Sequence, residues 1–209
     1  MLPLYELIAF LLFILTINFT AIKSNFLIDN KYDDHKKFSS NSKTPLTGGL
    51  FFLITILYYF DVSILLKICA ISIYFLGLLS DINRISSPLT RIIIQIIIIT
   101  IFVVISNNFV ENIRIELLDE FLNNIYFKTI FTIFCYLILI NGSNFIDGMN
   151  SLLIGYFLLV LLSLLLLSTT NNLIIDIHII KKLIICLFVL YILNISGLLF
   201  VGDSGAYLI

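Results

Sequence analysis

The chain has 209 residues, of which 60% are hydrophobic and 12% are charged, and its mean hydropathy is +1.13. A soluble domain is about half apolar and about a quarter charged, so this composition excludes an ordinary soluble protein and predicts an integral membrane protein. The net charge of −1 gives no reason to expect a nucleic-acid partner. Cys69, Cys135 and Cys186 lie inside apolar runs without metal-ligand spacing, and are interpreted as buried thiols.

The apolar runs predict a bundle of membrane-spanning helices, because a helix that crosses a bilayer needs about 20 apolar residues. The first run lacks the basic start of a signal peptide and is interpreted as a retained span. The run 48–79 is too long for one straight span and is interrupted by Asp61 and Lys67, so we divide it into two short helices with a turn near residues 61–63. The other predicted spans are residues 2–22, 89–106, 129–145, 152–168 and 183–201, with 206–209 as the start of an eighth.

These spans predict an all-α fold, a polytopic transmembrane bundle in which residues 1–209 form a single integral membrane domain. Four polar segments follow odd-numbered spans, so all four are expected on the same membrane surface; they are residues 23–47, 77–91, 141–152 and 200–205. If the run 48–79 were one span, the last three segments would still share a surface. Asp81, Asp147 and Asp203 therefore open on one face of the bundle, where acidic residues are usually functional.

Loop lysines and arginines give this surface an orientation. Seven of the 12 basic residues lie on the side of the polar segments, which predicts that this side faces the cytoplasm. On the opposite side, residues 107–127 contain a stretch in which polar and apolar residues partly alternate. This stretch is interpreted either as a short hairpin or interfacial strand or as a solvated loop.

The polar segments together carry the groups needed to bind a phosphate-linked substrate. Mg²⁺ is often held by one or two carboxylates plus substrate phosphates, and arginine matches phosphate oxygens with two parallel hydrogen bonds. Arg84 and Arg91 supply such groups, and glycines such as Gly48 and Gly49 let backbone approach a ligand closely. Taken singly, the glycines also suit a turn, Asp81 a helix end, and the arginines membrane anchors.

Four segments in this order resemble the polyprenyl-phosphate N-acetylhexosamine-1-phosphate transferases, which include the enzymes that start lipid-linked O-antigen and teichoic acid synthesis and the phospho-MurNAc-pentapeptide translocase. The resemblance implies a cytoplasmic active site that moves a sugar 1-phosphate from a UDP-sugar to polyprenyl (undecaprenyl) phosphate, releasing UMP. It also implies a requirement for Mg²⁺, with Mn²⁺ as a substitute. The segments are TPLTGGL (44–50), GLLSDINRISSPLTRIIIQ (77–95), NGSNFIDGMNSL (141–152) and FVGDSGAYLI (200–209).

The resemblance also implies roles on the metal and nucleotide side of the site. Asp203, in the sequence Gly-Asp-Ser-Gly, matches the principal Mg²⁺ ligand. Asp147, together with Asn144, is expected near the metal and the phosphates. Asn150 stands where the family more often has a second Asp that faces the uracil, and Asn194 lies near a uridine-side asparagine.

On the lipid side, Asp81 matches the second member of an Asp-Asp pair linked to the lipid phosphate nucleophile or its deprotonation. Arg84 and Arg91 match basic positions that bind phosphates, and Thr44 is a further substrate-binding candidate. The chain departs from the pattern at Ser80, where the first Asp of the pair is replaced, at Asn150, and at the residue after it, where the family has Gly.

Several alternatives stay open from the sequence. The family's later helices and its His-rich loop are missing, so a truncated product or a partial chain is expected. A catalytically degenerate relative and a polytopic cation transporter are the competing interpretations. The first segment is closer to the O-antigen initiators than to the translocases, which favours UDP-GlcNAc as donor. The expected partners are the membrane, the polyprenyl phosphate and the UDP-sugar, and a homodimer is left open.

Overall fold

The computed structural model describes residues 4–24, 27–28, 44–147, 151–171 and 176–209, and all regular secondary structure among them is helical. This confirms the predicted all-α fold. An isolated antiparallel bridge joins Ile28 to Pro45. The helices in chain order are α1 (Leu4–Ser24), α2 (Gly48–Tyr59), α3 (Ile64–Asp81), α4 (Pro88–Ser106), α5 (Glu116–Leu122), α6 (Ile125–Ile146), α7 (Leu152–Asn171), α8 (Ile177–Ile195) and α9 (Gly202–Ala206).

Four of these helices, α3, α4, α6 and α8, are long and apolar enough to cross a membrane. Their outward faces are apolar as well: on α4 the side chains of Ile93, Ile97 and Ile101 are 58%, 53% and 52% exposed. Such a stripe, with one residue per helical turn, suits contact with lipid hydrocarbon rather than water. The protein is an integral membrane protein.

The predicted division of residues 48–79 is confirmed. Helix α2 ends at Tyr59 and α3 begins at Ile64, where the Ser63 hydroxyl caps the helix by accepting a hydrogen bond from the Leu66 N–H at 3.3 Å. With 12 residues, α2 is about 18 Å long, which is shorter than the roughly 30 Å of a bilayer core. Helix α2 alone is therefore too short to reach straight across such a core, and the side of the membrane on which residues 23–47 lie stays a prediction.

Two sequence expectations are wrong in detail. The predicted span 183–201 continues past the real end of α8, because Gly197 adopts a φ of +70° and the chain turns there. The following residues are apolar and were counted as helix, but they form a connection in which Leu199 and Val201 are buried. Within residues 107–127, the stretch 112–118 was interpreted as a hairpin or strand or as a solvated loop; the strand alternative is wrong, since helix α5 begins at Glu116.

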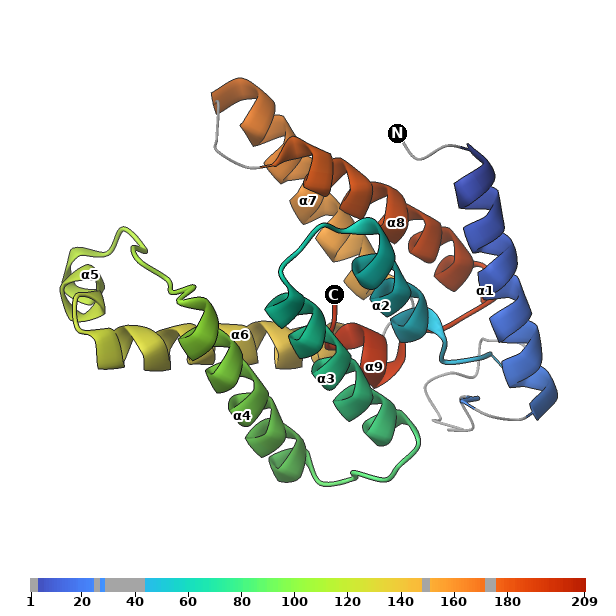
Figure 1. The fold of residues 1–209 in the computed structure, drawn as a ribbon, viewed down its shortest axis with the longest axis horizontal. Helices are drawn as coiled ribbons and strands as arrows, with labels where there is room; N and C mark the ends of the chain where they lie inside the picture. Colours follow the sequence, from blue (N-terminus) through green and yellow to red (C-terminus); the bar gives the residue numbers. More distant parts are fainter. Residues whose placement is uncertain (1–3, 25–26, 29–43, 148–150, 172–175) are drawn as a thin grey trace.

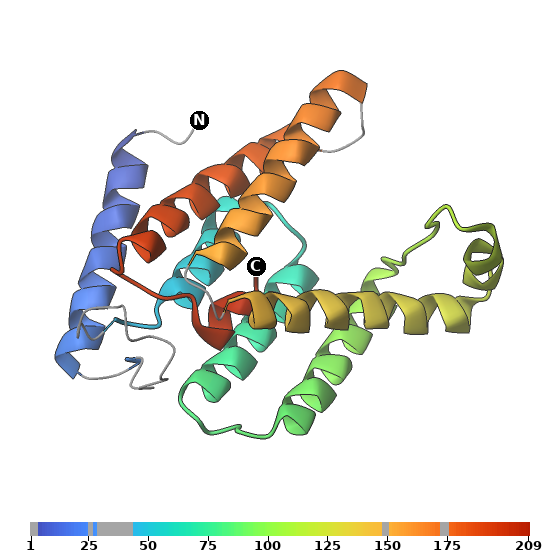
Figure 2. The ribbon, with the colours of Figure 1, turned by 180° about the vertical axis from the view of Figure 1, so that it is seen from behind.

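The helices form two groups that meet at α9 (Figure 1). Helices α7 and α8 lie side by side next to α1, whereas α3, α4 and α6 form the other group with α5 at its far end, as the reverse view also shows (Figure 2). Helix α9 contacts α2, α3 and α6, so it sits at the junction of the two groups. One apolar core joins α1, α2, α7 and α8, and another joins α3, α4 and α6.

A polar pair lies inside the contact between α4 and α6. The Asn141 side-chain amide donates to Gln95 Oε1 at 2.8 Å and to the Leu137 carbonyl at 2.9 Å. Gln95 is 0% exposed, and its Nε2 has no hydrogen-bond partner among the described residues. Since interhelical hydrogen bonds in membranes contribute about 1 kcal/mol, this pair fixes how α4 and α6 pack more than it adds to stability.

Candidate active site

Helix α9 is held against α2 and α3 at backbone contact distance, which only glycines permit. A Cβ added at Gly49 would lie 2.6 Å from the Gly205 nitrogen, and one added at Gly77 would lie 2.4 Å from the Ser204 Cα. Real side chains do not approach backbone so closely. In this structure the lack of a side chain at Gly49 therefore lets α9 pack against α2. From the sequence, the pair Gly48 and Gly49 had been interpreted as a close approach to a ligand or as a turn.

The segment before α9 also completes the start of α2. The Gly48 N–H donates to the Phe200 carbonyl at 2.9 Å, and the Gly49 N–H donates to the Val201 carbonyl at 3.2 Å. In return, the Phe200 N–H donates to the Pro45 carbonyl at 2.8 Å. The first N–H groups of a helix have no partner within the helix, so residues 45–49 and 200–201 stabilise one another and bring the first and last polar segments together.

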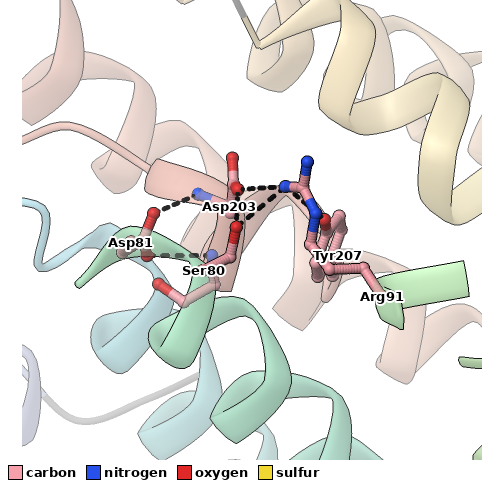
Figure 3. A network of polar contacts seen from close by, with 6 residues as sticks. Ser80, Asp81, Arg91, Asp203 and Tyr207 are labelled. Atoms are coloured by element: carbon pink, nitrogen blue, oxygen red, sulfur yellow. Dashed lines mark hydrogen bonds and ion pairs between the residues drawn. The ribbon is translucent and has the colours of Figure 1, made fainter. Parts of the chain in front are cut away.

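Asp81, the last residue of α3, binds the backbone at the start of α9. Its Oδ1 accepts a hydrogen bond from the Asp203 N–H at 2.8 Å, and its Oδ2 accepts one from the Ser204 N–H at 3.1 Å (Figure 3). Gly202 precedes these donors with a φ of +70°, a conformation that favours glycine. A Cβ at Gly202 would lie 2.9 Å from Asp81 Oδ2, so the turn and the carboxylate fit only with glycine there.

The Asp203 side chain is held by two neighbours, Ser80 and Arg91. Its Oδ2 accepts from the Ser80 hydroxyl at 2.5 Å and from Arg91 Nη1 at 2.9 Å. The same Nη1 donates to Ser80 Oγ at 2.8 Å and to the Tyr207 hydroxyl at 3.3 Å (Figure 3). The side chains of Arg91 and Asp203 are 20% and 29% exposed, so the pair contributes about 1 kcal/mol or less to stability. Its main effect is to orient Asp203.

The structure therefore brings together three of the predicted residues, Asp81, Arg91 and Asp203, from α3, α4 and α9. Asp147 follows the last residue of α6, the end of that helix that lies near α9 (Figure 1). Asn144 is partly buried in the last turn of α6. The described parts of the four polar segments thus lie near α9, and their placement on one membrane surface stays a prediction.

The remaining predicted residues lie apart from this cluster. Arg84 is exposed in the connection between α3 and α4. Asn194 is 3% exposed, donates to the Leu199 carbonyl at 3.0 Å and accepts from the Ser151 hydroxyl at 2.8 Å. The Thr44 hydroxyl donates to the Gly197 carbonyl at 3.3 Å. Asn150 lies outside the described residues.

Two members of the cluster were not predicted as functional. Ser80 had been noted only as the departure from an Asp-Asp pair, yet its hydroxyl bonds the Asp203 carboxylate. Tyr207 follows Asp203 by four residues, a spacing that places both side chains on one face of a helical turn. That spacing was readable from the sequence, but nothing local indicated that α4 would bring Arg91 to the same face.

The donor set fits a metal ion only with help from a substrate. Among residues 4–24, 27–28, 44–147, 151–171 and 176–209, no three His, Cys, Asp or Glu side chains gather closely enough to hold a metal ion. Asp203 keeps one carboxylate oxygen, Oδ1, without a hydrogen bond from the described residues. Mg²⁺ is commonly held by one or two carboxylates while substrate phosphates and water complete its coordination, so a single outward oxygen is compatible with this ion.

Residues 63–209 match the family described as glycosyl transferase family 4. Comparisons with curated proteins and with solved structures give no match. The matched region covers most of the chain and contains α3 to α9, hence Ser80, Asp81, Arg91, Asp147 and Asp203. This confirms the resemblance seen in the sequence. The chain therefore belongs to glycosyl transferase family 4, whose members transfer a phospho-sugar to a lipid carrier.

Proposed function

We propose that the protein transfers N-acetylhexosamine 1-phosphate from a UDP-sugar to polyprenyl (undecaprenyl) phosphate and releases UMP. This would be the first step in making a lipid-linked cell-envelope polysaccharide such as lipopolysaccharide O-antigen. UDP-GlcNAc is the proposed donor, because the first polar segment is closer to the O-antigen initiators. The proposed location is the bacterial inner membrane with the site on the cytoplasmic face.

One observation carries this proposal. Within a chain of a phospho-sugar transferase family, the helices bring Asp81 into contact with the Asp203 backbone and Arg91 into contact with the Asp203 side chain. A guanidinium beside carboxylates suits a phosphate substrate, since arginine binds phosphate oxygens and carboxylates hold its counter-cation. Positioning and electrostatic stabilisation supply most of the catalysis in phosphoryl transfer.

In the proposed reaction, an oxygen of the polyprenyl phosphate attacks the β-phosphorus of the UDP-sugar. A new P–O bond forms there while the bond from the β-phosphorus to the bridging oxygen breaks, and UMP leaves with that oxygen. The lipid phosphate is already largely ionised, because the second pKa of a phosphate monoester is about 6, so a strong base is not required. A two-step route through a phospho-enzyme is a chemical alternative.

The chain's own groups take complementary parts in this scheme. Arg91, already oriented by Ser80 and Asp203, is proposed to bind a substrate phosphate, and Arg84 in the exposed connection is proposed to bind another. Asp203, with Asp147, is proposed to hold Mg²⁺. When bound, Mg²⁺ would neutralise negative charge on the diphosphate as the β-phosphorus is attacked.

The asparagines and Thr44 are proposed to line the nucleotide-sugar side. Asn144 in the last turn of α6, with Asn150, would contact the sugar nucleotide. Asn194 and Thr44 bond the connection after α8 in this structure, so they are proposed to act by shaping the substrate-binding wall. Amide groups can both donate and accept hydrogen bonds, as a uracil ring requires.

The test is UMP release by membranes containing the full chain, supplied with polyprenyl phosphate, Mg²⁺ and a panel of UDP-sugars. We expect release with a UDP-N-acetylhexosamine and a large loss in the variant Asp203→Asn. The control is Asp61→Asn, the same change at an exposed aspartate in the α2–α3 turn. Equal, metal-dependent rates in both variants would refute the assignment of Asp203, and no release from the parent chain would refute the function.

A further inference from the structure

We propose that Asp81 is a positioning residue, which serves the reaction by holding the backbone that carries Asp203. This inference rests on the proposed function and assigns Asp81 a part different from the one its sequence position implied. A carboxylate acts as a general base through an oxygen that contacts the substrate, and each hydrogen bond accepted from the protein occupies one of that oxygen's two lone pairs. Both oxygens of Asp81 are bonded to protein N–H groups, those of Asp203 and Ser204.

The two hydrogen bonds from the Asp203 and Ser204 N–H groups to Asp81, here called the clasp, hold the turn that begins α9. They run from adjacent N–H groups to the two oxygens of one carboxylate, at 2.8 and 3.1 Å. Hydrogen bonds to a charged acceptor are stronger than those between neutral groups, so releasing one oxygen to a substrate would be costly. The clasp also requires Gly202, since a Cβ there would lie 2.9 Å from Asp81 Oδ2.

Ser80 and Asp81, which are adjacent in α3, hold different parts of Asp203. Asp81 fixes the main chain of Asp203 through its N–H group, whereas Ser80 bonds the side-chain Oδ2. Arg91 bonds that same oxygen from α4. The position of Asp203 Oδ1 is therefore fixed by contacts to both the main chain and the side chain of that residue. A displacement of about 1 Å at a reacting centre can lower a rate about 100-fold. Loss of the clasp is therefore expected to lower the rate of the proposed transfer.

The clasp can be tested without activity by hydrogen–deuterium exchange of the full chain in detergent. In the parent, the N–H groups of Asp203 and Ser204 are expected to exchange slowly, and peptides covering residues 199–207 report them. Asp81→Ala should release both amides and Asp81→Asn, which keeps one acceptor oxygen, should release fewer. The control Asp61→Ala should change neither. Unchanged protection of these two amides in Asp81→Ala would overturn the inference.

The effect on the reaction is tested by a double-variant cycle. UMP release is measured for Asp81→Asn, Asp203→Asn and the variant carrying both changes, each above the rate without protein. If Asp81 acts only through Asp203, the double variant loses no more than Asp203→Asn alone, within about threefold, because residues that act as a unit are not additive.

A base at Asp81 predicts a different result. General acid–base catalysis contributes about 10²–10⁴-fold, so the two losses would then multiply, and that outcome overturns the inference while leaving the proposed function intact. If the parent releases no UMP, the proposed function fails, and the exchange measurement alone decides whether Asp81 holds the turn.

Discussion

Gly77→Ala tests the close approach of α9 to α3. The added Cβ would lie 2.4 Å from the Ser204 Cα, 2.6 Å from the Ser204 nitrogen and 2.8 Å from the Asp203 carbonyl carbon. These are backbone atoms of a helix packed on both sides, so no flexible side chain can move aside. Comfortable contact between carbon atoms begins at about 3.5 Å, and α9 must therefore shift by roughly 1 Å away from α3.

The shift has two consequences that can be estimated. Forcing an extra methyl into a packed contact costs about 1–3 kcal/mol. The same shift lengthens the bonds from Asp81 to the Asp203 and Ser204 N–H groups, now 2.8 and 3.1 Å, and moves the Asp203 carboxylate. We expect a loss of about 1–3 kcal/mol in unfolding free energy, with a fall in UMP release of about 100-fold for a displacement of this size.

The assay combines thermal unfolding in detergent with UMP release, and Gly155→Ala in α7 is the control. There the added Cβ would meet only Tyr191 Cε2 at 3.5 Å, an ordinary contact, and alanine favours a helix by about 0.5–1 kcal/mol over glycine. This variant should be as stable as the parent or more so, with unchanged release. If Gly77→Ala behaves like Gly155→Ala, α9 is not held against α3 as described.

Two further changes address α4. Arg91→Lys keeps the charge but removes the planar group whose Nη1 contacts Ser80, Asp203 and Tyr207. UMP release should therefore fall about 10–100-fold, the equivalent of roughly 1.5–3 kcal/mol. The control Arg114→Lys, in the connection between α4 and α5, should leave the rate unchanged, and equal rates in both variants would contradict the role of Arg91. Gln95→Leu removes a buried amide nitrogen that has no partner among the described residues, together with the oxygen that accepts a hydrogen bond from Asn141. The unfolding free energy should stay within about 1 kcal/mol, because an interhelical hydrogen bond in a membrane contributes about that much. Gln95→Ala also leaves a cavity and should cost about 2 kcal/mol or more, and similar losses in both variants would show that the Gln95–Asn141 bond matters more than packing.

The sequence by itself determined that the chain is a helical membrane protein and where most helices lie. A bilayer excludes polar groups from its core, so long apolar runs interrupted by charged residues mark spans almost directly. The break at Asp61 followed from that rule, and counting crossings gave the prediction that the polar segments share one membrane surface. The family also followed, because its motifs are short local patterns that need no contacts to be seen.

The tertiary structure alone decided how the site is built. Asp81 and Asp203 are 122 positions apart, and no local pattern shows that one carboxylate would bind the other's backbone. The choice of Arg91 over Arg84 depends on how α4 packs against α3 and α9, and the end of α8 depends on one residue, Gly197, with positive φ. Hydropathy reports which residues avoid water, whereas hydrogen-bond partners and close backbone contacts depend on which helices meet.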